Sequence, residues 1–278
     1  MPPDTLFAIC AIAFGLAVGS FLNVVIYRLP RMMEAEWAVQ CAELSGQPAP
    51  PQSKLNLLLP GSHCPSCKTP LRIADNIPVL SYLIRRGKCA YCGTAISPRY
   101  PIVELLTAVL AGWVAWRFGF TLAGIAALVF IFILIALTFI DADTTLLPDS
   151  LTMPLLWLGL LVNLAGTFVP LHQAVIGAVA GYLILWSIYW LFKLATGKEG
   201  MGYGDFKLLS ALGAWFGWKM LLPIVLLSSV VGALVGVVLI VLARRGKEVP
   251  IPFGPYLAAA GFIVLMFGDL IARRYLPF

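Results

Sequence analysis

Long hydrophobic runs separated by short polar segments dominate the chain. A helix needs about 20 apolar residues to cross a hydrocarbon core of about 30 Å. The runs that approach this length are residues 5–27, 102–117, 121–140, 151–170, 173–193, 205–218, 220–242 and 251–271. The run 205–218 is the shortest, so we expect a short or broken helix there, lining protein or a wet cavity. The pattern predicts an all-α polytopic membrane protein with about eight transmembrane helices.

The composition and the placement of charge agree with this pattern. Of 278 residues, 60% are hydrophobic and 12% are charged, against about 25% charged in soluble domains. Fifteen of the 19 Lys and Arg residues lie in segments 28–101, 141–150, 193–207 and 243–250. Cytoplasmic loops carry such an excess, so we predict a periplasmic N-terminus. The net charge of +6 follows from this distribution, and we predict no nucleic-acid partner.

Four cysteines in the polar segment between the first two runs form two Cys-x-x-Cys pairs, Cys64 with Cys67 and Cys89 with Cys92. Each pair directs two thiolates from one tight turn at the same ion, and two such turns complete a tetrahedral site. We predict structural zinc in a zinc-ribbon-like domain, with no open position for catalysis. Iron is the alternative metal, and redox pairs or disulfides are the alternative chemistry, although a reducing cytoplasm disfavours disulfides.

The chain is therefore expected to have three parts. These are an N-terminal transmembrane helix over 1–30, a cytoplasmic domain with the tetracysteine site over 31–101, and a membrane-embedded domain over 102–278. Within the cytoplasmic part, residues 32–44 could form a short amphipathic helix. Residues 47–60 contain several prolines and are expected to form a loop.

Acidic side chains stand beside two of the hydrophobic runs. Asp141 opens a cluster with Asp143 and Asp149, and Asp205 ends the sequence Gly200-Met-Gly-Tyr-Gly-Asp205. An Asp costs about 2.5–3.5 kcal/mol at the centre of a membrane helix, so such residues are usually functional. Asp141 and Asp205 fall at cytoplasmic ends of predicted spans and can meet in one layer. Asp149, before Ser-Leu-Thr, suits the N-cap of the next helix.

Two carboxylates that meet share a proton, because two adjacent negative charges repel. The ionised partner can activate water while the protonated one polarises a carbonyl, which makes an aspartyl hydrolase. The residues alone leave two alternatives: a proton or cation relay in a transporter, and structural pairing with Lys198 or Lys207. The glycines before Asp205 are expected to keep the backbone thin where a substrate lies.

Two further polar residues have two interpretations each. Asn23, inside the first run, either forms a hydrogen bond between helices or contacts substrate or cofactor. Glu104, at the end of the second run, is either a snorkelling or ion-paired residue or a contact for a charged substrate segment.

Several motifs in this order resemble one family. They are Gly19-Ser-Phe-Leu-Asn-Val-Val-Ile-Tyr-Arg-Leu-Pro30, the two Cys pairs, Arg99-Tyr-Pro-Ile-Val-Glu104, the cluster Asp141–Asp149 and Gly202-Tyr-Gly-Asp205. Over nearly its whole length the chain resembles the bacterial type IV prepilin peptidases. These are bifunctional leader peptidases and N-methyltransferases of pilus and type II secretion systems, and the Gly-x-Gly-Asp motif is shared with other intramembrane aspartyl proteases.

The resemblance implies an inner-membrane enzyme whose catalytic aspartates are Asp141 and Asp205. It would cut prepilins or pseudopilins on the cytoplasmic side, after the Gly that ends a basic leader, and methylate the new N-terminus with S-adenosylmethionine. The sequence holds no Gly-rich βαβ unit of the kind that commonly binds such a cofactor, so it does not identify the residues that would bind S-adenosylmethionine. By elimination, the first span and the cysteine domain are the expected hosts. The rival classes are a transporter or channel with a zinc-binding regulatory domain and a structural assembly protein.

Overall fold

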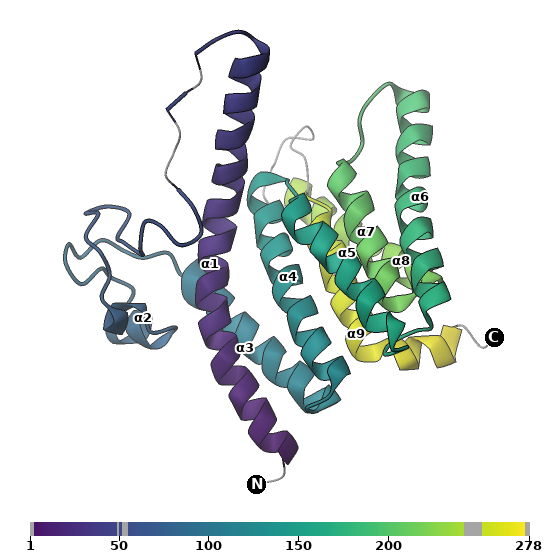
Figure 1. Cartoon of the computed structure of the whole chain (residues 1–278), viewed down its shortest axis with the longest axis horizontal. Coiled ribbons are helices and arrows are strands. Elements are labelled where there is room, and N and C mark those ends of the chain that lie inside the picture. The colour runs from purple at the N-terminus through teal and green to yellow at the C-terminus, as the bar shows by residue number, and fades with distance from the viewer. Residues whose placement is uncertain (1–2, 49, 52–54, 242–251, 276–278) are drawn as a thin grey trace. The chain divides into compact units, whose positions relative to one another are not determined.

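The computed structural model describes residues 3–48, 50–51, 55–241 and 252–275 of the chain, and these residues form helices and loops without a β-strand (Figure 1). The helices are α1 (Pro3–Leu44), η1 (Ile73–Asn76), α2 (Leu80–Ile84), α3 (Arg99–Phe118), α4 (Leu122–Thr144), α5 (Asp149–Leu164), α6 (Leu171–Thr196), α7 (Tyr203–Phe216), η2 (Trp218–Met220), α8 (Leu221–Val241) and α9 (Gly254–Tyr275). The predicted all-α class is confirmed.

A helix appears at each of the eight predicted spans, but the helices differ in length. Within the described residues, six are long and apolar enough to cross a membrane, namely α1, α3, α4, α6, α8 with the preceding turn, and α9. The other two are shorter: α5 has 16 residues and α7 has 14. The prediction that the run 205–218 forms a short helix is confirmed.

The first helix is longer than the sequence predicted. Instead of ending near residue 27, α1 continues through Pro30 to Leu44 and includes the segment 32–44. Proline removes one helical hydrogen bond, but its φ is compatible with a helix, so α1 can contain Pro30 without ending there. The described residues of the predicted loop 47–60 have no regular structure; residues 49 and 52–54 lie outside the described residues.

Packing contacts divide the chain into two compact units, Met1–Gly119 and Phe120–Phe278. In the first unit α3 packs along α1, because glycines let the two backbones approach. A side chain at Gly15 would place its Cβ 2.9 Å from Ala108 Cα, and one at Gly19 would place it 2.7 Å from Glu104 Cα. The three-part division at residues 30 and 101 stays a prediction.

The second unit is built around α7. Eleven of its 14 residues are buried, including Phe206, Trp215 and Phe216. A helix that is apolar on every side is stable only when other helices surround it, and here α5, α6 and α9 do so. This position explains why a short helix suits the site: α7 is enclosed by protein.

The contact between α6 and α7 depends on two glycines. A side chain at Gly213 would place its Cβ 2.1 Å from the Gly177 carbonyl oxygen, and one at Gly177 would place it 2.3 Å from the Gly213 oxygen. One turn away, Ser210 Oγ donates to the Ala178 carbonyl at 2.7 Å. The backbones of α6 and α7 therefore touch, which fixes the position of α7 along α6.

Asn163 and Trp215 join α5 to the C-terminal end of α7. Asn163 Nδ2 donates to the carbonyls of Ala214 and Trp215 at 2.9 and 3.0 Å, while the Trp215 indole donates to the Leu155 carbonyl at 2.8 Å. These bonds pair carbonyls at the helix end that no helical N–H reaches. Asn163 also accepts from the backbone of Phe168 and Val169, so one buried amide organises the whole turn after α5.

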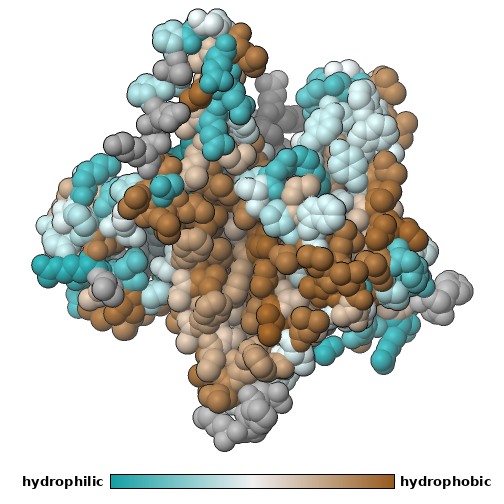
Figure 2. All heavy atoms as spheres, viewed as in Figure 1, coloured by the Kyte–Doolittle hydropathy of each residue, from teal (hydrophilic) through white to brown (hydrophobic). Residues whose placement is uncertain are grey.

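The outer surface of the second unit suits a lipid environment. Figure 2 shows hydrophobic surface along the flank of α6 and hydrophilic residues beyond its end. The exposed apolar side chains of α6 include Val175, Ile176, Val179, Leu183 and Ile188. Such continuous apolar exposure is uncommon on soluble monomers and typical of a bilayer-facing surface.

Candidate active site and metal centre

Asp141 lies in the last turn of α4, where that helix ends. Its side chain is 4% exposed, and its Oδ2 accepts a hydrogen bond from the backbone N–H of Gly254 at 2.9 Å. Thr145 follows in the left-handed conformation, with φ of 54°, and its N–H closes the helix on the Asp141 carbonyl. The carboxylate therefore points to the beginning of α9.

Asp205 lies in the first turn of α7, three residues after the N-cap Gly202. It is 7% exposed, and the backbone of Gly202 contacts its carboxylate. Within the described residues, its Oδ1 is the one buried side-chain nitrogen or oxygen atom without a hydrogen-bond partner. Leu147 lies against Gly204, which precedes Asp205, and beside Gly254, which bonds Asp141, so the two predicted acids lie in the same part of the second unit.

Leu147 packs against the backbone at Gly204, next to Asp205, and at Gly254, next to Asp141. A side chain at Gly204 would place its Cβ 2.6 Å from Leu147 Cβ. One at Gly254 would place its Cβ 2.6 Å from Asp141 Oδ2 and 3.1 Å from Leu147 Cδ2. The space beside Gly204, which the sequence suggested for a substrate, is thus filled by Leu147. The space beside Gly202 is open, with Gly204 N at 3.9 Å as its nearest neighbour.

The other acids of the cluster have different surroundings. Asp149 does not cap α5, since Pro148 is the N-cap and no side chain bonds there. Instead both carboxylate oxygens of Asp149 accept from Lys207 Nζ at 2.7 Å, at an exposed position. Asp143 is exposed. The structural pairing that the sequence left open therefore applies to Asp149, and it ties α5 to α7 two residues beyond Asp205.

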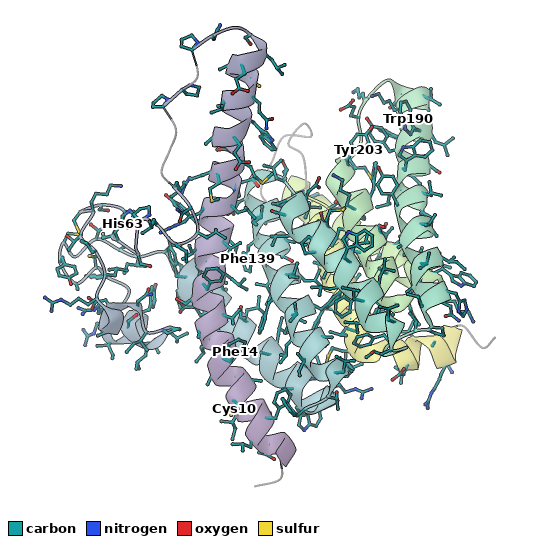
Figure 3. The ribbon with its side chains drawn as sticks, viewed as in Figure 1. Cys10, Phe14, His63, Phe139, Trp190 and Tyr203 are labelled. Carbon is teal, nitrogen blue, oxygen red and sulfur yellow. The ribbon has the colours of Figure 1, made fainter. Side chains whose placement is uncertain are left out.

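A second ion pair holds the loop before α7. Lys193 Nζ, near the end of α6, donates to Glu199 Oε1 at 2.8 Å and to the Tyr189 hydroxyl at 3.2 Å. The hydrogen bond from Lys193 lowers the pKa of the Glu199 carboxyl. The rings of Tyr189 and Tyr203 lie 5.4 Å apart, and Figure 3 shows Tyr203 and Trp190 at the same end of the bundle. These contacts fix the loop that leads into α7, whose first turn carries Asp205.

The four cysteines predicted as metal ligands come together in the first unit. The sulfur atoms of Cys64, Cys67, Cys89 and Cys92 all lie within 4.8 Å of one another. Four thiols at this separation fit a tetrahedral zinc or iron site. Hydrogen bonds from the Thr94 hydroxyl and backbone lower the pKa of the Cys92 thiol to about 6. Those from Thr69 lower the pKa of Cys67, so both sulfurs favour the thiolate that a metal requires.

The two cysteine turns are copies of one structure, offset by 25 residues. In the first turn Cys64 N donates to the Thr69 carbonyl, and in the second Cys89 N donates to the Thr94 carbonyl. Isolated bridges follow the same offset, joining His63 with Pro70 and Lys88 with Ala95. Lys68 and Gly93 both have positive φ after the second cysteine. This repeat explains how two short turns present equivalent pairs of sulfurs.

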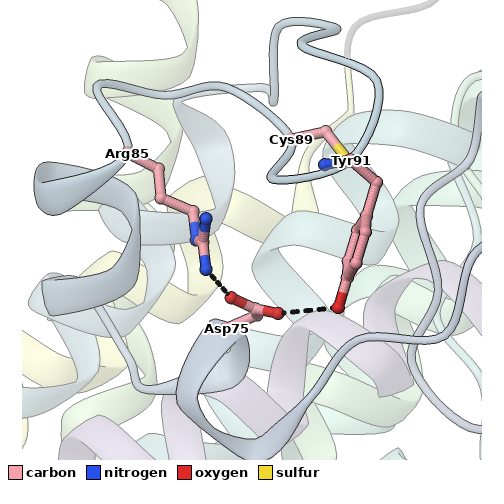
Figure 4. Close-up of polar contacts among 4 residues, drawn as sticks. All are labelled: Asp75, Arg85, Cys89 and Tyr91. Carbon is pink, nitrogen blue, oxygen red and sulfur yellow. Dashed lines mark hydrogen bonds and ion pairs between the residues drawn. The ribbon is translucent and has the colours of Figure 1, made fainter.

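A buried acid braces the second turn. Asp75 accepts from the Arg85 guanidinium and, at 3.3 Å, from the Tyr91 hydroxyl (Figure 4). Tyr91 stands between the two cysteines of its pair, and its N–H lies 3.5 Å from Cys89 Sγ. Asp75 therefore holds the chain between the two turns against the metal-binding loop.

Asn23 and Glu104 both join parts of the first unit. Asn23 Nδ2 donates to the Tyr100 carbonyl at 3.1 Å, which is the interhelical bond expected between α1 and α3. Glu104 is buried; it accepts from Val79 N at 2.7 Å and bonds the Ser20 side chain. Val79 has a φ of 59°, which is strained for a β-branched residue. Within the described residues Glu104 forms no ion pair. Its contacts are hydrogen bonds to the backbone of Val79 and to the Ser20 side chain.

The sequence analysis missed three residues: Gly254 and Leu147 beside the acids, and Asn163 at the far end of α7. Gly254 stands between prolines in Pro252-Phe-Gly-Pro255, a signal for a helix start that could have been linked to the acids. Leu147 and Asn163 stand out only in three dimensions. An ordinary Leu and a lone Asn in apolar segments carry no pattern that predicts their neighbours.

Comparison with known proteins finds a family model for each of the two units and relatives that cover nearly the whole chain. The model of the bacterial peptidase A24 N-terminal domain matches residues 13–118, and that of the type IV leader peptidase family matches residues 128–237. A prepilin leader peptidase/N-methyltransferase of Pseudomonas aeruginosa is 56% identical over 273 residues, covering 98% of this chain and 94% of its own. Proteins of the same name are 57% identical in Aeromonas salmonicida, over 95% of this chain and 91% of theirs, and 52% identical in Burkholderia pseudomallei, over 93% and 84%. No solved structure matches the chain.

Proposed function

The chain belongs to the type IV leader peptidase family, and we propose that Asp141 and Asp205 are the carboxylates with which it cuts its substrate. It is a multi-pass inner-membrane enzyme that acts on prepilins as a leader peptidase and as an N-methyltransferase. The observation that carries the catalytic assignment is the meeting of two buried acids from α4 and α7. The matches give no support to the transporter alternative.

The two carboxyl groups suit hydrolysis of a peptide bond by acid–base catalysis. Two adjacent acids share a proton, so the ionised one can take a proton from water while the protonated one polarises the scissile carbonyl. The substrates are prepilins or pseudopilins, cut after the Gly that ends a basic leader. The excess of Lys and Arg supports a periplasmic N-terminus and acids that face the cytoplasmic side.

The first unit is the host of methyl transfer in this proposal. Its four sulfurs fit zinc, and because all four tetrahedral positions are protein ligands the metal is structural. S-adenosylmethionine supplies the methyl group. The supporting facts are that the peptidase acids lie in the second unit and that a separate family model covers the first.

Cleavage of a purified prepilin in detergent micelles tests the catalytic assignment. Asp141→Asn and Asp205→Asn are each expected to lower kcat/KM at least about 100-fold, since each removes one arm of acid–base catalysis. Asp143→Asn is the matched control, because that acid is exposed in the same turn. Cleavage near the wild-type rate in both variants would contradict an aspartyl mechanism. An inactive wild type would favour transport.

A further inference from the structure

The two acids of the site do not have equivalent hydrogen bonds. Asp141 Oδ2 receives the N–H of Gly254, the first residue of α9, at 2.9 Å. Asp205 Oδ1 is buried and has no partner. Asp141 belongs to the last turn of α4, but its carboxylate lies at the N-terminus of α9, whereas Asp205 lies in the first turn of α7. The backbone of Gly202 contacts the Asp205 carboxylate, yet its Oδ1 is left without a partner. The hydrogen bond from Gly254 to Asp141 stabilises the charged form of that carboxylate.

An unpaired oxygen is costly on a buried carboxylate but useful on a carboxylic acid. A buried acceptor without a donor costs about 1–3 kcal/mol, and more when it is charged. If the atom carries a proton, it becomes a donor for the first acceptor that enters the site. The acceptor that a peptide substrate brings is its carbonyl oxygen.

We propose that Gly254 is a positioning residue whose N–H holds Asp141 as the general base, while Asp205 carries the shared proton on Oδ1 and is the general acid. This inference rests on the proposed aspartyl mechanism and assigns a separate role to each of its acids. Glycine is required at position 254 because a Cβ there would lie 2.6 Å from Asp141 Oδ2, inside the hydrogen-bonded contact.

The assignment gives a balanced reaction. Asp141 takes a proton from water as the water oxygen bonds to the carbonyl carbon, and Asp205 gives its proton to the carbonyl oxygen. The product of this step is a neutral gem-diol. Asp141 then returns its proton to the leaving nitrogen as the C–N bond breaks, and Asp205 takes a proton from one diol hydroxyl. Both acids end in their starting states.

Other charged groups near the pair are already engaged. Lys207 and Asp149 bond each other, as do Lys193 and Glu199, and Asp143 is exposed. The difference between the two acids that the structure shows is therefore the Gly254 N–H on Asp141 and the unpartnered Oδ1 of Asp205.

Asparagine substitutions test the roles directly. An Asn side chain can still donate a hydrogen bond to a carbonyl oxygen but cannot take a proton from water. Asp205→Asn is expected to keep residual cleavage at least about tenfold above Asp141→Asn, while Asp205→Ala, which has no donor, falls to the Asp141→Asn level. Equal residual rates in the two Asn variants, or the reverse order, would overturn the assignment. Full activity in both would instead remove the aspartyl mechanism on which it rests.

Gly254→Ala tests the positioning role. We expect kcat for prepilin cleavage to fall roughly 10- to 100-fold with KM nearly unchanged, because the added Cβ displaces a carboxylate that must be held within about 1 Å. The acidic limb of the kcat/KM profile should move to higher pH, since Asp141 loses the donor that stabilises its charge. A merely structural defect would lower the amplitude without moving the limb.

Gly268→Ala is the control in the same helix, because a Cβ there would lie 3.7 Å from Val264 Cγ1, an ordinary contact. It should cleave like the wild type. Thermal unfolding of both variants in detergent separates misfolding from mispositioning. A Gly254→Ala protein with wild-type kcat and pH profile, or a Gly268→Ala protein with the same defect, would overturn the proposal.

Discussion

Leu147 occupies the space that a side chain at Gly204 would need: a Cβ there would lie 2.6 Å from Leu147 Cβ. Gly204 directly precedes Asp205, and Leu147 lies on the loop that follows Asp141. The absence of one side chain in α7 therefore lets the loop after α4 lie against the turn that carries Asp205.

Adding that side chain should misplace Asp205. Gly204→Ala is expected to lower the prepilin cleavage rate by up to about 100-fold, because Leu147 and the first turn of α7 must move apart. Leu147→Gly removes the opposing Cβ, so the double variant should be less impaired than the product of the two single effects. Measuring kcat for all four proteins checks this coupling, and strictly multiplicative losses would contradict it.

Asp149 should matter far less than Asp141. It forms an exposed ion pair with Lys207, and such pairs contribute about 0–1 kcal/mol. Asp149→Asn is therefore expected to slow cleavage no more than roughly fivefold, and exchanging the two residues, Asp149→Lys with Lys207→Asp, should recover part of the loss. Measured kcat/KM decides: if Asp149→Asn is as inactive as Asp141→Asn, then Asp149 belongs to the catalytic pair.

The backbone contact between α6 and α7 should be sensitive to one methyl group. Gly213→Ala places a Cβ 2.1 Å from the Gly177 carbonyl oxygen, a backbone atom that no side-chain rotation can move. We expect a loss of about 3 kcal/mol in the free energy of unfolding, the upper end for overpacking. Thermal unfolding in detergent measures it, and Gly268→Ala serves as the comparison. An unchanged Tm for Gly213→Ala would show that the helices separate at little cost.

Metal retention should depend on pH through Thr94. Its hydrogen bonds lower the pKa of the Cys92 thiol from 9.0 to about 6, so protons compete with the metal for this sulfur only as the pH falls toward 6. Without the hydroxyl, the thiol pKa rises and competition begins at higher pH. Thr94→Val should release zinc about one pH unit higher than the wild type, while Thr94→Ser, which keeps the hydroxyl, should not. Zinc captured by a chromogenic chelator against pH gives the midpoint, and coincident midpoints would exclude this role for Thr94.

The elements that the sequence predicted well are those set by local pattern. Apolar runs placed the helices, and Cys-x-x-Cys spacing grouped Cys64, Cys67, Cys89 and Cys92. The distribution of acids along the spans singled out Asp141 and Asp205, which are both buried in the second unit, and their catalytic role stays a prediction. Each of these signals is carried by residues close together in the chain.

The predictions that failed depended on distant partners. Asp149 has the composition of an N-cap but bonds Lys207 on another helix. Pro30 signals a helix end, yet α1 continues through it although a proline inside a helix costs about 3 kcal/mol. Gly254 looks like an ordinary helix start, and only the fold places its N–H on Asp141. Such contacts join segments whose separation along the chain hides them.

The short length of α7 has a consequence for the access of water to the site. Fourteen residues rise about 21 Å, against about 30 Å of hydrocarbon. With Asp205 in its first turn, the deficit lies on the side of the loop that carries Lys198 and Glu199. Because α5, α6 and α9 surround α7, the bilayer meets these neighbouring helices and not α7 itself. A helix that stops short at membrane depth is tolerated where its end lines protein or a water-filled cavity, so we expect water to reach Asp205 from the side of this loop.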